Sequence, residues 1–158
     1  MTQKITPFLW FDDQAEEATN FYVSIFKNSE ILSVRRLGNA GPGTEGTVMG
    51  TSFRLEGQEF MALNGGPAFT FTEAISLFID CASQDEVDDV WEKLSAGGET
   101  SRCGWLKDRY GLSWQVIPSV LGDMLTDQDP ERTGRVMEAM MQMIKIDIAE
   151  LKRAYDGA

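Results

Sequence analysis

Residues 108–118, DRYGLSWQVIP, combine a turn with a strand and decide how the fold closes. Asp108 and Gly111 are residue types that turns favour, the first for its side-chain hydrogen bonds and the second for its backbone freedom. Residues 113–117 largely alternate between polar and apolar side chains, with the period of two that a half-buried strand requires. We therefore predict a closing strand with Gln115 at its centre.

The two faces of this strand differ in character. If Gln115 points into a cavity, Ser113 and Ile117 point in the same direction. Trp114 and Val116 then turn to the opposite face, where apolar side chains pack against helices.

The chain before this strand repeats one order of elements. We expect a first series with strands at 5–11, 31–37, 47–55 and 59–64, and a helix at 14–26 after the first strand. We expect a second series with strands at 71–80, 99–103, 105–107 and 113–117, and a helix between Ser83 and Gly97. Capping-box spacing predicts the helix starts, at Asp13 with Glu16 and at Ser83 with Glu86.

Each series reads βαβββ, which predicts an α+β fold class. Neither module alone covers both faces of its sheet, so we expect the two modules to form a curved mixed sheet. The predicted boundaries are 1–67 for the first module, 68–118 for the second and 119–158 for a C-terminal helical extension, all in one compact domain.

The extension has its own helix signals. Asp129 is predicted to cap a helix with Pro130 in the first position, and Asp147 with Glu150 indicates a second helix start. The first helix carries an apolar stripe, which suits core or dimer packing: Met137, Met140, Met141 and Ile144.

Composition narrows the classes of function. The chain has 158 residues, of which 42% are hydrophobic, a net charge of −11 and a pI of about 4.4. Such an acidic surface repels phosphate backbones and anionic lipids, so we expect no nucleic-acid partner and no membrane partner. No apolar run approaches the ~20 residues of a membrane span, and no signal-peptide pattern is visible, so we expect a cytoplasmic protein.

Two further features are weak candidates for chemistry. Cys81 and Cys103 do not make a disulfide framework, and the chain contains no histidine that could act as their base. Packing therefore explains them better, although Arg102 could lower the pKa of the Cys103 thiol. The glycine-rich residues 38–46 match neither a phosphate-binding nor a dinucleotide-binding motif, and are predicted to be a connector or lid.

Three stretches carry a resemblance to a known family: TPFLWFDDQAEEATNFY at 6–22, GTVMGTSFRLEGQEFMALNGGP at 46–67 and CGWLKDRYGLSWQVIP at 103–118. With the two βαβββ modules, they resemble the PhnB-like branch of the vicinal oxygen chelate superfamily, which includes glyoxalase I, extradiol dioxygenases and bleomycin resistance proteins. That branch is often labelled demethylubiquinone methyltransferase-like. The resemblance implies the fold, and the branch has no well-defined shared reaction to carry over.

The resemblance also implies where the metalloenzymes of the superfamily would bind a divalent ion. The corresponding positions here are Thr6, Asn64, Ala74 and Gln115. None of them is a histidine, a cysteine or a carboxylate, which are the ligands that divalent transition metals prefer. Ala68 stands where members of the branch often carry a histidine. We therefore expect no metal and no cofactor.

The interior of the curved sheet is where the superfamily binds its ligands. Aromatic side chains with a few polar anchors are predicted to line this pocket: Thr6, Phe8, Trp10, Asn64, Ser76, Phe78 and Gln115. The alternative is that these aromatic side chains fill the core of the sheet.

The expected function is metal-independent binding of a small molecule by a PhnB-like homodimer. Three alternatives stay open at this point. They are a metal-dependent enzyme of the glyoxalase or dioxygenase type, a drug-sequestering resistance protein, and a methyltransferase. The last would need a glycine-rich loop for S-adenosylmethionine between a strand and a helix, and the sequence shows none.

Overall fold

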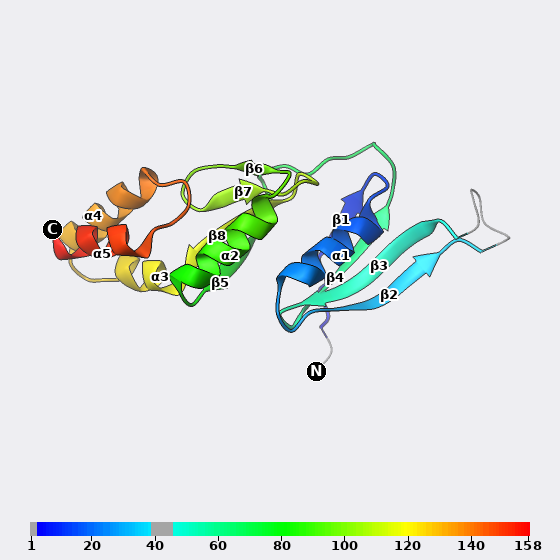
Figure 1. The fold of residues 1–158 in the computed structure, drawn as a ribbon, viewed down its shortest axis with the longest axis horizontal. Helices are drawn as coiled ribbons and strands as arrows, with labels where there is room; N and C mark the ends of the chain where they lie inside the picture. The colour runs from blue at the N-terminus through cyan, green and yellow to red at the C-terminus, as the bar shows by residue number, and fades with distance from the viewer. Residues whose placement is uncertain (1–2, 39–45) are drawn as a thin grey trace. The chain divides into compact units, whose positions relative to one another are not determined.

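The computed structural model describes residues 3–38 and 46–158, so most of the predicted 38–46 connector lies outside the described residues. The chain divides into two compact units, residues 1–70 (unit 1) and residues 71–158 (unit 2), which run from blue to cyan-green and from green to red in Figure 1. The predicted boundaries after residues 67 and 118 stay predictions. No helix within the described ranges is long and apolar enough to cross a membrane.

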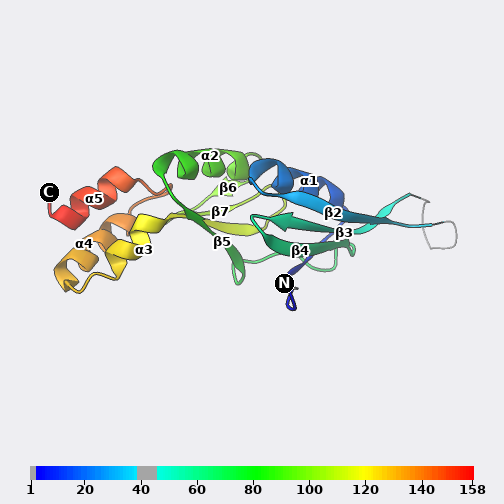
Figure 2. The same ribbon diagram turned by 90° about the horizontal axis from the view of Figure 1, so that it is seen from below.

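Unit 1 holds the first βαβββ module. Its elements are β1 (Phe8–Phe11), α1 (Ala15–Ile25), β2 (Glu30–Arg36), β3 (Val48–Leu55) and β4 (Gln58–Asn64). The strands form one sheet in the order β1-β4-β3-β2, in which β1 and β4 are parallel and the other neighbours are antiparallel. Helix α1 lies over one face of this sheet (Figure 2).

Unit 2 repeats this arrangement and adds the C-terminal extension. Its module consists of β5 (Ser76–Cys81), α2 (Gln84–Ser95), β6 (Glu99–Thr100), β7 (Trp105–Lys107) and β8 (Ser113–Pro118), with the sheet order β5-β8-β7-β6. The extension consists of α3 (Ser119–Leu125), α4 (Pro130–Met141) and α5 (Ile148–Asp156). The predicted α+β class and the two βαβββ modules are confirmed.

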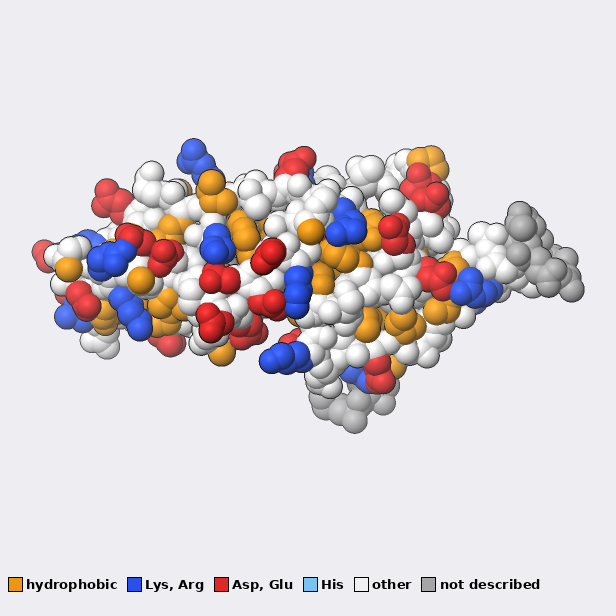
Figure 3. Space-filling model, in the orientation of Figure 1, with side chains coloured by type: hydrophobic (Ala, Val, Ile, Leu, Met, Phe, Trp, Pro, Cys, Tyr) orange, Lys and Arg blue, Asp and Glu red, His pale blue; other side chains and the backbone are white. Residues whose placement is uncertain are grey.

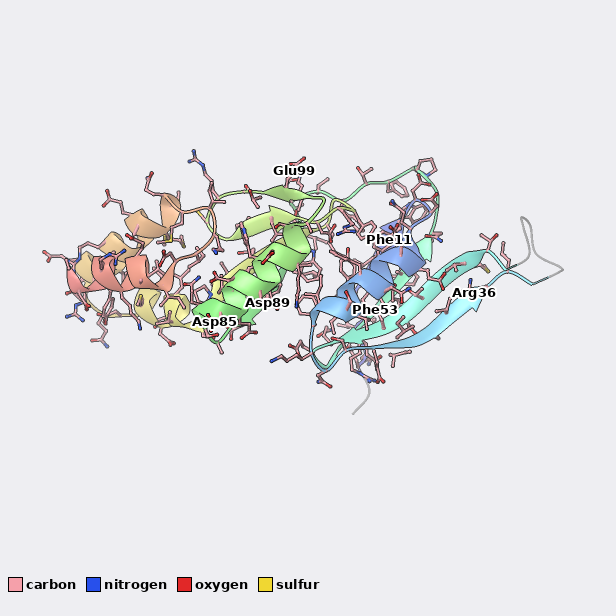
Figure 4. All side chains as sticks on the ribbon, in the orientation of Figure 1. Phe11, Arg36, Phe53, Asp85, Asp89 and Glu99 are labelled. Carbon is pink, nitrogen blue, oxygen red and sulfur yellow. The ribbon has the colours of Figure 1, made fainter. Side chains whose placement is uncertain are left out.

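The core of unit 1 lies between α1 and the sheet. Tyr22 of α1 is fully buried beside Phe53 of β3, with ring centroids 6.3 Å apart. Phe11 of β1 is also buried, and Figure 4 labels Phe11 and Phe53 next to α1. Each such aromatic side chain contributes about 2–3 kcal/mol when it leaves water. The sheet face covered by α1 is thus the apolar one.

Helix α1 does not begin as predicted from Asp13. The residue before the helix is Gln14, which makes no capping hydrogen bond with its side chain. Instead, the backbone N–H of Ala15 donates to Oδ1 of Asn64 over 2.8 Å. The cap therefore comes from β4, about fifty residues away, and local spacing cannot reveal it.

Strand β5 is shorter than predicted, because it begins at Ser76 and not at Phe71. The N–H groups of Ala74 and Ile75 donate to the hydroxyl and carbonyl oxygens of Thr72, respectively. These bonds turn the chain before the strand can start, since threonine side chains compete for backbone partners.

The extension forms its own small core. Helix α3 was not predicted separately, although Leu121 and Met124 have helical spacing and are buried. The predicted caps Asp129 and Asp147 are confirmed, because each accepts a backbone N–H of the helix it precedes. The buried cluster joins β8 to the extension: Ile117, Leu121, Met124, Val136, Ile146 and Leu151.

The predicted apolar stripe of α4 is mostly exposed. Met137 and Met141 are open to solvent, and Met140 is half-buried against the cluster. Ile144 is also exposed, but it lies beyond the end of α4 at Met141, so the predicted stripe extends past the helix. The residue of α4 that enters the core is Val136, one position before the predicted stripe. The stripe therefore covers the flank of the helix and not its buried face.

Candidate functional site

The face of the β5–β8 sheet that α2 leaves open carries an aromatic row. The strand register places Phe78 opposite Gln115, and Gln115 opposite Trp105. Residues directly opposite each other on neighbouring strands point to the same face, so these three side chains lie side by side. We call Phe78, Gln115 and Trp105 the aromatic row.

The amide of Gln115 is held in one orientation. Its Nε2 donates to Oγ of Ser76 over 2.9 Å. Among the described residues, none donates a hydrogen bond to Oε1 of Gln115. With Nε2 bonded to Ser76, the row presents the carbonyl oxygen of Gln115 between two aromatic rings.

A pocket of about 550 Å³ lies on the aromatic row. Phe78 is 60% exposed, so it does not fill a core in unit 2. The sheet and the extension supply the other lining residues: Asp80, Cys103, Ile117, Pro118, Ser119, Leu121, Gly122, Leu125 and Met140. The structure brings Ser76, Phe78 and Gln115 together on one face, where Phe78 and Gln115 line the pocket and Ser76 is the hydrogen-bond partner of Gln115.

Asp108 determines which way Gln115 points. Its buried carboxylate accepts the backbone N–H groups of Tyr110 and Leu112 at 2.8 and 3.1 Å, and Nε1 of Trp114 at 2.9 Å. The first two bonds form the predicted turn, and the third holds the Trp114 indole on the α2 face. Because side chains alternate along β8, Gln115 must then occupy the open face.

The open face of unit 1 carries Phe8 and Trp10, two of the residues predicted to line the pocket. Phe8 lies opposite Met61 of β4 and is 54% exposed. It joins a pocket of about 950 Å³ that Arg35 and Ser52 also line. Thr6 precedes β1, where its Oγ1 accepts a hydrogen bond from Nε2 of Gln3 at 3.5 Å.

Trp10, also on this face, is tied down within unit 1. Its Nε1 donates to the carbonyl oxygen of Gly66 over 2.9 Å, and its ring meets the ring of Phe69 edge-on at 4.9 Å. A Cβ atom at Gly65 would lie only 2.3 Å from the indole, so the backbone packs directly on the ring. Trp10 is held by its neighbours and has little freedom to adapt to a ligand.

Asn64 lines the pocket of about 950 Å³ together with Phe8, and its amide is also engaged with α1. It pairs with the buried Phe11 and caps α1 through Oδ1, while its Nδ2 donates to the carbonyl oxygen of Val48 over 3.0 Å. Both ends of the amide are therefore in use, and Asn64 supports α1.

The four positions implied for a metal do not fit a divalent ion. Oδ1 of Asn64 is occupied by α1, Ala74 has no ligating atom and lies before β5, and Gln115 offers one neutral amide. Residues 3–38 and 46–158 contain no group of three or more His, Cys, Asp or Glu side chains that could hold a metal ion. Neutral amides hold divalent transition metals poorly.

The two thiols are no better placed for catalysis. Burial, with the nearby carboxylates of Glu86 and Asp80, raises the pKa of Cys81 to about 12, so this thiol stays protonated at neutral pH. Cys103 lines the pocket with its Sγ 3.9 Å from Sδ of Met141. No imidazole is available to deprotonate it, because the chain has no histidine.

Sequence reasoning missed Trp105 as a site residue. The signal was present, because counting outward from a turn at 108–112 pairs Lys107 with Ser113 and Trp105 with Gln115. It also missed Leu125 and Met140, since a helix that packs back onto the sheet leaves no local mark in the sequence.

Acidic side chains cluster on one face of unit 2 (Figure 3). Figure 3 shows acidic side chains gathered over α2, where Asp85 and Asp89 lie exposed (Figure 4). A surface of this charge repels polyanions.

Comparisons with known proteins give the family. The model of the family described as 3-demethylubiquinone-9 3-methyltransferase matches residues 3–117. The solved structure of the PhnB protein from Bacillus cereus is 45% identical, with 73% of this chain and 99% of that chain covered and a TM-score of 0.68. No curated protein matches the chain.

Two more distant structures show the fold alone. A protein from Pseudomonas aeruginosa is 19% identical, with 74% of this chain and 98% of that chain covered and a TM-score of 0.62. The fosfomycin resistance protein FosX from Listeria monocytogenes is 18% identical, with 72% and 90% covered and a TM-score of 0.50. Because the family model spans most of the chain and the Bacillus cereus protein is similar over almost its whole length, this chain belongs to the PhnB-like, or 3-demethylubiquinone-9 3-methyltransferase, family of the vicinal oxygen chelate superfamily.

Proposed function

We propose that this protein binds a small, largely aromatic molecule on the open face of unit 2 without a metal ion. The observation that carries the proposal is the aromatic row, in which Gln115 lies between Phe78 and Trp105 inside a pocket of about 550 Å³. Ligand pockets of ~300–1,000 Å³ lined by aromatic groups and a few polar atoms are typical of small-molecule sites.

The chemistry of the row suits binding more than catalysis. The two rings can stack on or meet the edge of a planar ligand, and Oε1 of Gln115 can accept one hydrogen bond. The only carboxylate among the lining residues is that of Asp80, which accepts the hydroxyl of Ser119 at 2.7 Å. General acid–base catalysis most often uses a histidine, and the chain contains none.

The reaction in the family description is not part of the proposal. A site for S-adenosylmethionine of the usual kind needs a glycine-rich turn from a strand into a helix. The turn from β1 to α1 contains Asp12, Asp13 and Gln14, and the turn from β5 to α2 contains Ala82 and Ser83. Neither turn has a glycine.

The working unit is proposed to be a homodimer. Each sheet is covered by a helix on one face, and exposed Phe8 and Phe78 lie on the other faces. Apolar faces of this kind mark association surfaces. Sedimentation at micromolar concentration is expected to give twice the 17.6 kDa chain mass, and a monomer under these conditions would contradict the dimer.

The binding proposal can be tested with N-phenyl-1-naphthylamine, an uncharged aromatic amine whose fluorescence rises in apolar pockets. Replacing Trp105 or Phe78 with alanine is expected to weaken its binding at least ~10-fold, since a stacked ring contributes about 1.5 kcal/mol. Gln115→Ala removes the acceptor and is expected to weaken binding less.

Phe69→Ala is the control, because it removes an exposed aromatic side chain in unit 1 that does not line the pocket. Its affinity for the amine should match that of the unaltered protein. If the unaltered protein does not bind the amine, or if all four variants bind it equally, the proposed site is wrong.

A further inference from the structure

The C-terminal extension, residues 119–158, is an addition to the shared family fold. The family model ends at residue 117. The Bacillus cereus protein uses 99% of its own length to cover 73% of this chain, so it has no counterpart for about a quarter of it.

The extension is fastened to both edges of the aromatic row. At β5, Oγ of Ser119 donates to Oδ1 of Asp80 over 2.7 Å. At the start of β7, the N–H groups of Cys103 and Gly104 donate to the carbonyl oxygens of Met143 and Ile144 over 2.9 and 2.8 Å. Gly104 has φ +83°, and a Cβ atom there would lie 2.8 Å from Ile117, so glycine is required at this junction.

A third attachment joins the extension to α2. Nε2 of Gln84 donates to the carbonyl oxygen of Ile146 over 3.0 Å, and Oε1 of Gln84 accepts the N–H of Ile148 over 2.7 Å. Lys145 pairs with Asp88 over 2.8 Å. Hydrogen bonds at three separate elements hold the extension in one position.

This position makes the extension a wall of the pocket. Leu121, Gly122 and Leu125 of α3 and Met140 of α4 line the same space as the aromatic row. Without these side chains the row would lie on an open sheet surface. The extension therefore decides how long a molecule can lie on the row.

The charges of the pocket limit the ligand as well. Its lining residues include no lysine and no arginine, and the single charged side chain is Asp80. The polar atom at the centre, Oε1 of Gln115, can only accept a hydrogen bond. An anion would meet no cation here, whereas an N–H or O–H donor would find a partner.

We propose that the C-terminal extension is the specificity-determining wall of this pocket, and that the pocket takes uncharged or cationic aromatic compounds carrying an N–H or O–H donor. The inference rests on the proposed function, because it concerns the ligand of the same site.

Two glycines allow a matched test of the wall. A Cβ atom at Gly122 in α3 or at Gly134 in α4 meets nothing within 4 Å, so a side chain can leave the backbone at either helix position without a clash at Cβ. Only Gly122 lines the pocket. Gly122→Leu is expected to weaken binding of N-phenyl-1-naphthylamine at least ~10-fold by filling the space, whereas Gly134→Leu leaves it unchanged.

Thermal unfolding should show that both variants remain folded, since replacing a helix glycine should not lower the melting temperature. If Gly122→Leu binds as tightly as Gly134→Leu while Trp105→Ala still loses binding, the aromatic row is a site and the wall is not. If Trp105→Ala also has no effect, the proposed function itself fails, and the wall with it.

A second pair of probes tests the charge. The probe 8-anilinonaphthalene-1-sulfonate has the same ring system and N–H as the uncharged amine, plus one sulfonate. We expect the unaltered protein to bind the uncharged amine at least ~10-fold more tightly, since a desolvated anion beside Asp80 has no partner. Equal or tighter binding of the sulfonate would overturn the proposed ligand class.

Discussion

The open faces of the two units differ although their elements follow the same order. In unit 1, the Trp10 indole donates a hydrogen bond to the carbonyl oxygen of Gly66 and packs against the ring of Phe69, so residues of unit 1 itself cover it. In unit 2, Phe78 and Trp105 face a pocket whose far wall comes from helices added after the module. Both open faces carry a pocket, and only that of unit 2 is walled by the added helices, which is the difference on which the proposed ligand site rests.

The two units also differ in the polar group that fixes their closing strands. Unit 2 uses the buried carboxylate of Asp108, which accepts three hydrogen bonds within its own turn and strand. Unit 1 uses the amide of Asn64, which joins β4 to α1 and β3. A buried carboxylate with three donors around it should be the more costly of the two to remove.

The largest effect is expected for Asp108→Ala. The substitution leaves two backbone N–H groups and the Trp114 indole without their acceptor in a site where Asp108 is only 3% exposed. We expect the free energy of unfolding to fall by roughly 3–5 kcal/mol, as measured by urea denaturation.

Two comparisons sharpen this prediction. Asp108→Asn keeps an acceptor for the turn and loses the bond to Trp114, so it should lie between alanine and the unaltered chain. Asp85→Ala removes an exposed carboxylate of the same unit and should change stability little. An Asp108→Ala variant as stable as Asp85→Ala would show that the carboxylate does not hold the strand.

The role of Asp108 could be predicted from the sequence, whereas the role of Asn64 could not. The turn at Asp108 and the caps at Asp129 and Asp147 depend on partners within a few residues, so spacing alone predicted them. Period-two alternation likewise placed Phe78 and Gln115 on one face. Local chemistry leaves a readable signal of this kind.

The role of Asn64 and the wall of the pocket could not be predicted in this way. Asn64 lines the pocket of unit 1, but its hydrogen bonds to Ala15 and Val48 join segments far apart in the chain, so spacing does not reveal its role as the cap of α1. Leu125 and Met140 reach the pocket because the extension folds back on unit 2 through contacts with Gln84 and Gly104. Packing between segments that lie far apart in the chain leaves no periodic pattern of residues in the sequence.

A smaller effect is expected for Asn64→Ala. The substitution removes the remote cap of α1 and the bond to the carbonyl oxygen of Val48, so the free energy of unfolding should fall by about 1–2 kcal/mol. Asn64→Asp keeps an acceptor for the N–H of Ala15 and places a favourable negative charge at the start of the helix, but it loses the donor to the carbonyl oxygen of Val48, so its stability should lie between those of the alanine variant and the unaltered chain. If alanine and aspartate destabilise equally in urea denaturation, capping is not what Asn64 contributes.

The smallest effect concerns acid and the attachment of the extension. The hydrogen bond from Lys145, followed by that from Gln84, lowers the pKa of the Asp88 carboxyl below its ordinary value. A carboxyl group whose pKa is depressed in the folded state stabilises that state above the ordinary pKa, and this stabilisation is lost as the pH falls through the folded-state value.

The Asp88 side chain is 45% exposed, so solvent screening limits the contribution to about half a kcal/mol. Asp88→Asn should therefore lower stability slightly at neutral pH, and the difference from the unaltered chain should shrink as the pH falls through the folded-state pKa of Asp88. Asp89→Asn on the same helix removes the pairing with Lys93, which does not involve the extension. If hydrogen exchange shows faster opening of α5 in Asp88→Asn and not in Asp89→Asn, Lys145 and Asp88 help to hold the extension, and equal exchange in both variants would contradict that role.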